Sequence, residues 1–443
     1  MLASTTIKHR YKRHLPAVQQ LMSWHPHLWH PTTQVATSPE PLQVRRARGC
    51  ELELADGRRL IDAISSWWVT LHGHAEPSIA AAIAGQAQKL EQVIFANFSH
   101  EPAEQLATRL SSLTGLQRLF FSDNGSTAIE VALKMAWQWW SNQGQPRHQL
   151  IAFEGAYHGD TFGAMAVGER SLFTAPFESL LFDVTRVAWP HTHWDDDSVD
   201  QREQQALAQL DLALQTPTAA VILEPLLQGA SGMRLVRSGF VRAVAARAEA
   251  SGALLIADEV MTGFGRTGAL FACQKAGVQP DLMALSKGLT GGFLPMGVTM
   301  ASERLYQGFI GTDPLVTFFH GHSFTANPLG CAAALASLDL LQAQPERFQQ
   351  FEARHTPGLE QLAQHPHVRH VRTLGTIAAF DVEAGDDGYL NPVGKQIQRL
   401  CVDQGVYLRP LGNTVYLIPP LSISALQLQQ CYTALSLALD QLA

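Results

Sequence analysis

The chain has 443 residues, a length that predicts about two or three packed units. Its residues are 46% hydrophobic and 16% charged, which is typical of a globular protein with a large core. No apolar run reaches the roughly 18 residues that a membrane-spanning helix needs. The net charge of -7 is spread along the chain, so we expect neither a membrane segment nor a nucleic-acid-binding surface.

The cysteines predict a reducing compartment. There are five of them, an odd number, and no two stand at the spacing of a C-x-x-C pair. This pattern disfavours both a disulfide framework and a structural zinc site. We therefore expect a cytoplasmic protein without a metal centre.

The start of the chain has an unusual charge pattern. The first 39 residues contain no Asp or Glu but include Lys8, Arg10, Lys12 and Arg13. An acid-poor basic segment is typical of an organelle transit peptide. A disordered tail, or an upstream start codon with Met22 opening the ordered chain, explains the same pattern, and we favour this second interpretation.

Short aliphatic runs alternate with longer segments of helical period, which predicts an α/β fold with a mainly parallel sheet. The first clear helix is predicted over Thr127–Trp140, with Thr127 and Glu130 at the spacing of a capping box. The predicted strands, in chain order, are Leu150–Phe153, Ala219–Leu223, Ala253–Ala257, Leu282–Leu285 and Val415–Ile418. We expect a large domain over residues 81–335 and a smaller α+β domain over 336–443, which the N-terminal segment 1–80 joins.

Two predicted strands end next to residues that carry chemistry. Asp258 closes one apolar run, and Lys287 follows another and precedes a Gly-rich turn. Because carboxyl ends of parallel strands meet at one edge of a sheet, both side chains should reach one crevice. A structural ion pair would use the same two residues. Of the seven lysines, however, only Lys287 has this context, and a nucleophilic amine needs such a desolvated pocket.

Two further segments also follow predicted strands. Gly125 and Ser126, in S-D-N-G-S, would offer backbone amides and a hydroxyl at a helix N-terminus, where phosphate binds well. An ordinary helix cap is the simpler interpretation of that segment. Tyr157, in G-A-Y-H-G-D, could stack on a flat aromatic cofactor, although a single tyrosine is more often packing.

Taken together, S-D-N-G-S, Y-H-G-D, E-P, D-E-V-M-T-G-F-G-R-T-G and S-K-G resemble the class III pyridoxal-5'-phosphate (PLP) aminotransferases of fold type I. The resemblance covers residues from about 29 to 420. It implies that Lys287 binds PLP covalently, that Asp258 pairs with the ring nitrogen and that Tyr157 covers the ring. Gly125 and Ser126 would hold the phosphate. PLP is an effective electron sink only with its ring nitrogen protonated, which a neighbouring carboxylate favours.

Further segments are similar to those members of the family that aminate 8-amino-7-oxononanoate in biotin synthesis. By resemblance, Trp67 and Trp68 line the hydrocarbon chain of that substrate and Arg409 binds its far carboxylate, for which a planar guanidinium is well suited. Tyr157, Lys287, Gly321 and Arg266 are expected at the substrate as well. S-adenosylmethionine is the expected amino donor, and ornithine, 4-aminobutyrate or a diamine are the alternative substrates. A same-fold aminomutase is a further alternative, and so is a binding protein of this fold without catalytic activity, which the intact Lys287, Asp258 and Tyr157 disfavour.

The same resemblance implies a homodimer with active sites at its interface. Gly321, His322 and Ser323 match a loop that reaches the phosphate from the partner subunit. The family usually has Pro-Thr where this chain has His322 and Ser323, and the hydroxyl is kept. It usually has an aromatic residue where this chain has Thr32, so we expect the detail of the substrate contact at Thr32 to differ from the family's.

A cluster of His and Asp residues invites a metal-site interpretation. The segment W-P-H-T-H-W-D-D-D contains His191, His193 and three aspartates, which are suitable ligand types. No second ligand group lies near it in the sequence. We therefore predict a solvated loop there and no metal site.

Overall fold

A computed structural model describes residues 24–383, 385 and 388–442, so the basic segment and Met22 lie outside the described residues. Within that part, seven strands form the central sheet, and β12 runs antiparallel to both of its neighbours while the other pairs are parallel. Their order across the sheet is β4 (Arg118–Ser122), β12 (Gly297–Ala301), β11 (Leu282–Leu285), β10 (Leu254–Asp258), β7 (Thr218–Leu223), β5 (Gln149–Phe153) and β6 (Thr185–Val187).

Helices cover both faces of this sheet. Successive strand residues point to opposite sides, so each face has its own apolar core against its helices. Leu254 and Ile256 belong to the core beneath α4 (Gly125–Asn142), whereas Leu255 packs with α7 (Ser238–Ser251). Further helices of this unit are α3 (Glu101–Thr114), α5 (Phe162–Val167), α6 (Val199–Ala213), α8 (Ala272–Ala276) and α9 (Glu303–Gln307). The central strands are thus buried on both faces, which explains their nearly continuous apolar sequences.

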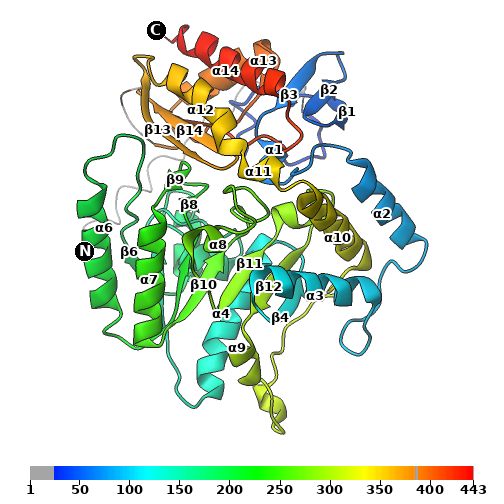
Figure 1. Ribbon diagram of the computed structural model, residues 1–443, viewed down its shortest axis with the longest axis vertical. Coiled ribbons are helices and arrows are strands. Elements are labelled where there is room, and N and C mark those ends of the chain that lie inside the picture. Colours follow the sequence, from blue (N-terminus) through cyan, green and yellow to red (C-terminus); the bar gives the residue numbers. More distant parts are fainter. Residues whose placement is uncertain (1–23, 384, 386–387, 443) are drawn as a thin grey trace.

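The two ends of the chain meet in one sheet. Strand β15 (Val406–Tyr407) pairs in parallel with β3 (Arg59–Asp62), which continues through β2 (Glu51–Leu54) to β1 (Val44–Arg48). Figure 1 shows these blue N-terminal strands beside the orange and red C-terminal helices, above the green central sheet. The predicted domain division, in which the N-terminal segment joins the C-terminal domain, stays a prediction together with its boundaries.

A second, antiparallel sheet lies in the C-terminal part of the chain. It contains β13 (Val368–Leu374), β14 (Ile377–Val382) and β16 (Thr414–Leu417). The helices around it are α11 (Glu346–Gln349), α12 (Phe351–Leu362), α13 (Val393–Asp403) and α14 (Ala425–Leu439). The remaining elements include α1 (Ser65–Trp68), α2 (Pro77–Ala87), α10 (Pro328–Ala343), the hairpin β8 (Leu227–Gln228) and β9 (Arg234–Leu235), and the 3₁₀ turn η3 (Lys287–Thr290). In the described ranges no helix is both long and apolar enough to cross a membrane.

The predicted mainly parallel α/β fold is confirmed, and the five predicted strands lie within one residue of the observed ones. The predicted start of the long helix is wrong. Helix α4 begins at Gly125, and its N-cap is Asn124, whose side chain accepts a hydrogen bond from the Thr127 amide at 2.9 Å. Glu130 does not complete a capping box but accepts from the amides of Gly163 and Ala164 in α5. The cap lies earlier because Asn124 has the extended backbone that a capping residue needs.

Candidate active site

A cavity of about 640 Å³ opens at the carboxyl ends of β5, β7, β10 and β11. This is the edge of an α/β sheet at which ligands usually bind. Among its lining residues are Trp68, Asn124, Gly125, Ser126, Tyr157, His158, Asp160, Glu224, Asp258 and Lys287. The structure therefore brings together the predicted lysine, carboxylate, aromatic and helix-terminus residues.

Lys287, which lines the cavity, has a strained backbone and an amine with a lowered pKa. It follows β11 and has φ of 39°, a left-handed conformation that is strained for a residue with a side chain. Burial lowers the pKa of its amine, while the nearby Asp258 and Glu224 carboxylates oppose that shift. The Lys287 Nζ lies 5.0 Å from the centre of the Trp68 ring. A lysine with a lowered pKa in such a pocket is suited to covalent bonding with a carbonyl group.

The N-terminus of α4 forms another wall of the cavity. A Cβ atom on Gly125 would lie 2.6 Å from Val260 Cγ1, so only glycine lets the helix begin this close to the loop after β10. Ser126 Oγ lies 2.7 Å from Thr161 Oγ1 and accepts a hydrogen bond from the Thr161 amide at 3.0 Å. The first-turn amides of a helix have no partner within it, so this terminus favours an anion.

The loop after β5 carries the predicted Tyr157 and two residues whose roles the sequence did not reveal. Tyr157 is 41% exposed, and burial together with the Asp160 carboxylate raises the pKa of its phenol. His158 Nδ1 lies 2.6 Å from Asp258 Oδ2. Glu224, at the end of β7, accepts a hydrogen bond from the Tyr157 amide at 3.1 Å. His158, Asp160 and Glu224 stand inside the Y-H-G-D and E-P motifs, and that position was the only signal available.

The two tryptophans stand on a strained segment. Ser65, Ser66 and Trp68 all have positive φ, between 52° and 66°. The buried Asp62 holds this turn by accepting hydrogen bonds from the amides of Ile64 at 3.2 Å and Ser66 at 2.6 Å. Strain of this kind persists only where the surroundings enforce it, and it often marks a functional site.

The side chains of the tryptophan pair point to different surroundings. Trp68 is buried, lines the cavity and donates from Nε1 to the Tyr416 hydroxyl at 3.1 Å. Trp67 is 44% exposed, and the Arg409 guanidinium carbon lies 4.5 Å from its ring centre. Arg409 also donates from Nη2 to Thr32 Oγ1 at 2.8 Å. Three predicted residues, Thr32, Trp67 and Arg409, therefore form one contiguous cluster next to the cavity wall.

Arg266 is not among the residues that line the cavity. It is 1% exposed and donates to the backbone oxygen of Pro419 at 3.0 Å and to that of Trp68 at 3.5 Å. Burial lowers the pKa of its guanidinium to about 9, and Asp62 acts against this shift. These contacts support the strained tryptophan segment from behind. A direct contact of Arg266 with substrate stays a prediction.

The loop with Gly321, His322 and Ser323 also lies away from the cavity lining of its own chain. The Ser323 carbonyl oxygen accepts a hydrogen bond from Gln92 at 3.1 Å, and the His322 amide donates to Thr325 Oγ1 at 3.0 Å. Phe319 and Phe324 next to this loop are 72% and 65% exposed. Within a single chain, therefore, the predicted phosphate contact of this loop is not made.

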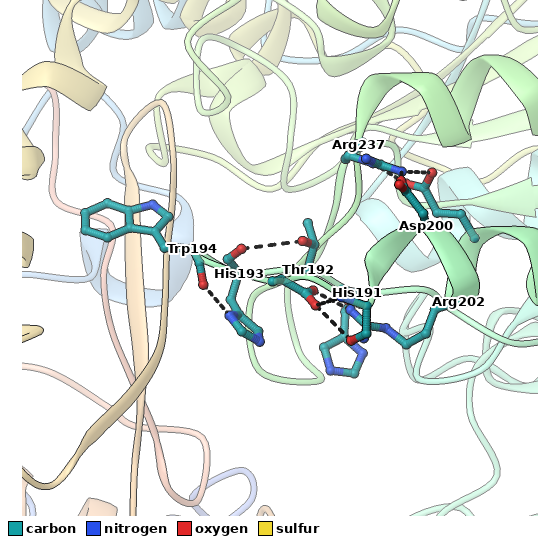
Figure 2. A network of polar contacts seen from close by, with 10 residues as sticks. His191, Thr192, His193, Trp194, Asp200, Arg202 and Arg237 are labelled. Atoms are coloured by element: carbon teal, nitrogen blue, oxygen red, sulfur yellow. Dashed lines mark hydrogen bonds and ion pairs between the residues drawn. The ribbon is translucent and has the colours of Figure 1, made fainter.

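The cluster of His and Asp residues before α6 makes structural contacts. Figure 2 shows that His193 turns its Nδ1 toward the carbonyl oxygen of Trp194, at 2.6 Å, while Arg202 from α6 donates to the carbonyl oxygen of His191 at 2.7 Å. The Trp194 amide donates to Val371 of β13, so the segment links the central unit to the C-terminal sheet. The expected solvated loop is thus only partly right, because His191 is exposed but Trp194 packs against the core. Across the described ranges, no group of three His, Cys, Asp or Glu side chains has the arrangement of a metal site.

The residues of the cavity fit pyridoxal phosphate. A covalently bound, phosphorylated pyridine needs an amine, an anion site and a carboxylate for the ring nitrogen, and Lys287, the α4 N-terminus and Asp258 line one space. The exposed ring of Tyr157 offers a flat apolar surface in the same space.

Comparisons with known proteins agree with this geometry. The family model of class-III aminotransferases matches residues 32–439. An adenosylmethionine-8-amino-7-oxononanoate aminotransferase from Synechococcus elongatus is 57% identical over 95% of this chain and 100% of its own length. One from Geobacter sulfurreducens is 38% identical over 92% of this chain and 94% of its own.

Solved structures of aminotransferases have a similar fold. The crystal structure of the adenosylmethionine-8-amino-7-oxononanoate aminotransferase from Methanocaldococcus jannaschii has a TM-score of 0.85 at 31% identity, over 93% of this chain and 97% of that one. An amine transaminase from an uncultivated Pseudomonas species, in a PLP-bound form, has a TM-score of 0.89 at 30% identity, over 95% and 100% of the two chains. The chain therefore belongs to the class-III aminotransferases, and its expected fold type and its expected cofactor, pyridoxal phosphate, are confirmed.

Proposed function

We propose that this aminotransferase converts 8-amino-7-oxononanoate to 7,8-diaminononanoate in biotin synthesis, with S-adenosylmethionine as the amino donor. The relatives at 57% and 38% identity are named for this pair of compounds. The observation that carries the proposal within the structure is the contact of Arg409 with Trp67, 4.5 Å from guanidinium carbon to ring centre.

That contact suits the far end of a long substrate. The keto substrate has a reacting carbon, a hydrocarbon chain and a terminal carboxylate. Lys287 lies 5.0 Å from the Trp68 ring, Trp67 is the next residue, and Arg409 lies over Trp67. One tryptophan ring thus lies beside the reactive amine and the other beside a cation, and a guanidinium can bind a carboxylate through two parallel hydrogen bonds.

Each cavity residue has a proposed part in the reaction. When bound, PLP supplies the carbonyl that takes up the amino group and the electron sink for the carbon that loses a proton. Lys287 would bind the cofactor and, once displaced by a substrate amine, move a proton to or from the substrate carbon. Its lowered pKa leaves more of the neutral amine that can accept this proton.

The other residues hold and orient. The Asp258 carboxylate would keep the ring nitrogen protonated, and Tyr157 would cover the ring. Gly125 and Ser126 would bind the phosphate through the amides at the N-terminus of α4. Thr32 would orient Arg409, and Arg266 would support the tryptophan segment.

A homodimer is the proposed assembly. The loop of Gly321, His322 and Ser323 does not line the cavity of its own chain, and the aromatic residues Phe319 and Phe324 beside it are exposed. Exposed aromatic side chains gathered on one loop are typical of an interaction surface. We propose that the loop completes the phosphate site of a second copy.

The five free, buried cysteines support the proposed cytoplasmic location.

A panel of substrates tests the function. The purified enzyme is given 8-amino-7-oxononanoate with S-adenosylmethionine, lysine, ornithine, 4-aminobutyrate or a diamine, and 7,8-diaminononanoate is measured by mass spectrometry. We expect product with S-adenosylmethionine. Amination of other acceptors from ornithine or 4-aminobutyrate, with no use of 8-amino-7-oxononanoate, would leave the family intact and overturn the proposed substrate.

A further inference from the structure

The carboxylate that faces the cavity is held from behind by a buried imidazole. His158 Nδ1 and Asp258 Oδ2 are 2.6 Å apart, and the two side chains are 0% and 5% exposed. His158 belongs to the loop after β5, and Asp258 ends β10, so two separate strands supply the pair. Such a short contact between buried groups is typical of a charge-assisted hydrogen bond.

The second oxygen of the carboxylate is held as well. Asp258 Oδ1 accepts a hydrogen bond from the Val260 amide at 3.0 Å. Each oxygen therefore receives one donor from the protein, and a carboxylate has about four lone-pair sites. The two bonds fix the plane of the group and leave acceptor capacity for a donor in the cavity, which Asp258 lines.

The imidazole is itself held in place. The preceding residue, Tyr157, donates its amide hydrogen to Glu224 Oε1 at 3.1 Å, and Glu224 Oε2 accepts from the Gly229 amide at 3.0 Å. His158 Nε2 is buried without a hydrogen-bond partner in the described part of the chain. Since Nδ1 faces a carboxylate acceptor, Nδ1 carries a proton in this arrangement.

We propose that His158 is a positioning residue for the reaction, which acts by fixing the Asp258 carboxylate toward the ring nitrogen of the cofactor. The inference rests on the proposed role of Asp258. Without the Nδ1–H donor the carboxylate would keep only the Val260 bond and could rotate away. His158 would then affect cofactor binding and the chemical step more than substrate binding.

Two variants separate the hydrogen bond from simple packing. His158→Asn places an amide N–H close to the position of Nδ1, whereas His158→Leu fills similar space without a donor. We expect His158→Leu to weaken PLP binding and lower kcat by about tenfold to hundredfold, the range for a hydrogen bond to a charged group, with KM within about twofold. His158→Asn should recover most of both losses.

The readouts are kcat, KM and the PLP dissociation constant, measured by titrating the cofactor-free full-length protein and following absorbance. His355→Leu is the matched control, because His355 is an equally buried imidazole bonded to Tyr432 and Thr376. It should lower the melting temperature and leave the PLP dissociation constant unchanged. Equal loss in His158→Leu and His158→Asn, or no loss in either, would overturn the proposal.

A coupling measurement separates an effect that passes through Asp258 from a general effect on packing. In an Asp258→Ala background, the His158→Asn and His158→Leu changes should both leave the PLP dissociation constant unaltered, because the group they position is gone. A further loss in that background would mean that His158 acts by another route. The PLP titration needs no substrate, so a failure of the proposed substrate assignment does not affect it.

Discussion

Arg409 donates a hydrogen bond from Nη2 to the Thr32 hydroxyl at 2.8 Å, across 377 positions of sequence. Thr32 has φ of 50°, an unusual left-handed conformation for a β-branched residue. The same guanidinium lies over the Trp67 ring. The cation thus has one polar and one aromatic contact, which together limit the directions in which it can point.

Removal of the Thr32 hydroxyl should loosen Arg409. Thr32→Val keeps the shape of the side chain but offers no acceptor, and we expect KM for 8-amino-7-oxononanoate to rise about threefold to tenfold, equivalent to about 1 kcal/mol. Thr33→Val is the control, because the Thr33 hydroxyl donates to Pro31 and not to Arg409. Steady-state kinetics measure both. The same rise in the two variants would point to a general effect on the segment.

Removal of Arg409 itself should have the larger effect. Arg409→Ala takes away the proposed partner of the substrate carboxylate, and a charge pair of this kind contributes about 2–5 kcal/mol when it is buried. Arg409 is only partly buried, so we expect the lower end of that range. Single-turnover kinetics of the two half-reactions should show the loss with 8-amino-7-oxononanoate and a much smaller one with S-adenosylmethionine. Equal losses in both would make Arg409 structural.

Lys287→Ala should abolish turnover and the long-wavelength absorption of lysine-bound PLP. Lys287 is the one lysine among the described residues that line the cavity, so no other side-chain amine there can bind PLP covalently. Lys275→Ala is the control, since Lys275 donates to the Thr267 carbonyl oxygen at 2.8 Å and does not line the cavity. After borohydride reduction and digestion of the wild type, mass spectrometry should find the pyridoxyl group on Lys287. A label on another lysine would contradict the assignment.

Asp258→Asn should slow transamination by about a hundredfold or more, through loss of the charge that keeps the ring nitrogen protonated. The amide can replace the carboxylate only if its nitrogen faces His158, because Val260 donates to the other oxygen. His158 would then have to carry its proton on Nε2. Comparison of kcat and of PLP binding tests this: near-normal kcat would show that another carboxylate serves the ring.

The central strands could be predicted closely, because a strand buried on both faces has a continuous apolar sequence. The cavity residues next to strand ends, such as Asp258 and Lys287, could be placed for the same reason. The expected start of α4 at Thr127 is wrong because the Thr127–Glu130 spacing imitates a capping box, whereas Asn124 caps the helix and Glu130 bonds to α5. The hydrogen bond between Thr32 and Arg409 could not be predicted, because it joins residues that are far apart in the sequence. No local pattern in the sequence announces such a pair.

The contacts around Asp258 could not be predicted from the sequence either. His158 stands beside Tyr157 in the sequence, yet only the fold brings its imidazole within 2.6 Å of Asp258. Glu224 stands in the E-P pair, and its bonds to the Tyr157 and Gly229 amides depend on the loop after β5 and the hairpin after β7. A sequence motif can mark such residues, but their roles come from contacts between strands.

The buried His355 makes the stability of the fold sensitive to acid. Its Nε2 faces the Thr376 carbonyl oxygen at 3.1 Å and its Nδ1 faces the Tyr432 hydroxyl at 2.8 Å, so the neutral ring satisfies both partners. Burial lowers the pKa of His355 from 6.5 to about 4. Below pH 6.5 the unfolded chain binds a proton that the folded chain does not bind until about pH 4. The stability is therefore complete above pH 6.5 and falls as the pH drops through this window, by about 1.4 kcal/mol per pH unit.

His355→Gln should remove that part of the pH dependence, because an amide can serve both partners and does not titrate. Urea unfolding of the PLP-saturated protein, at fixed protein concentration, gives the free energy of unfolding at pH 5, 6 and 8. Burial lowers the pKa of His72 as well, so the variant should keep part of the slope and lose the part that corresponds to one proton. Any packing cost of the substitution appears equally at pH 8, where histidines are neutral in both states, and is subtracted there. An unchanged slope between pH 6 and 5 would show that His355 takes up its proton in the folded state.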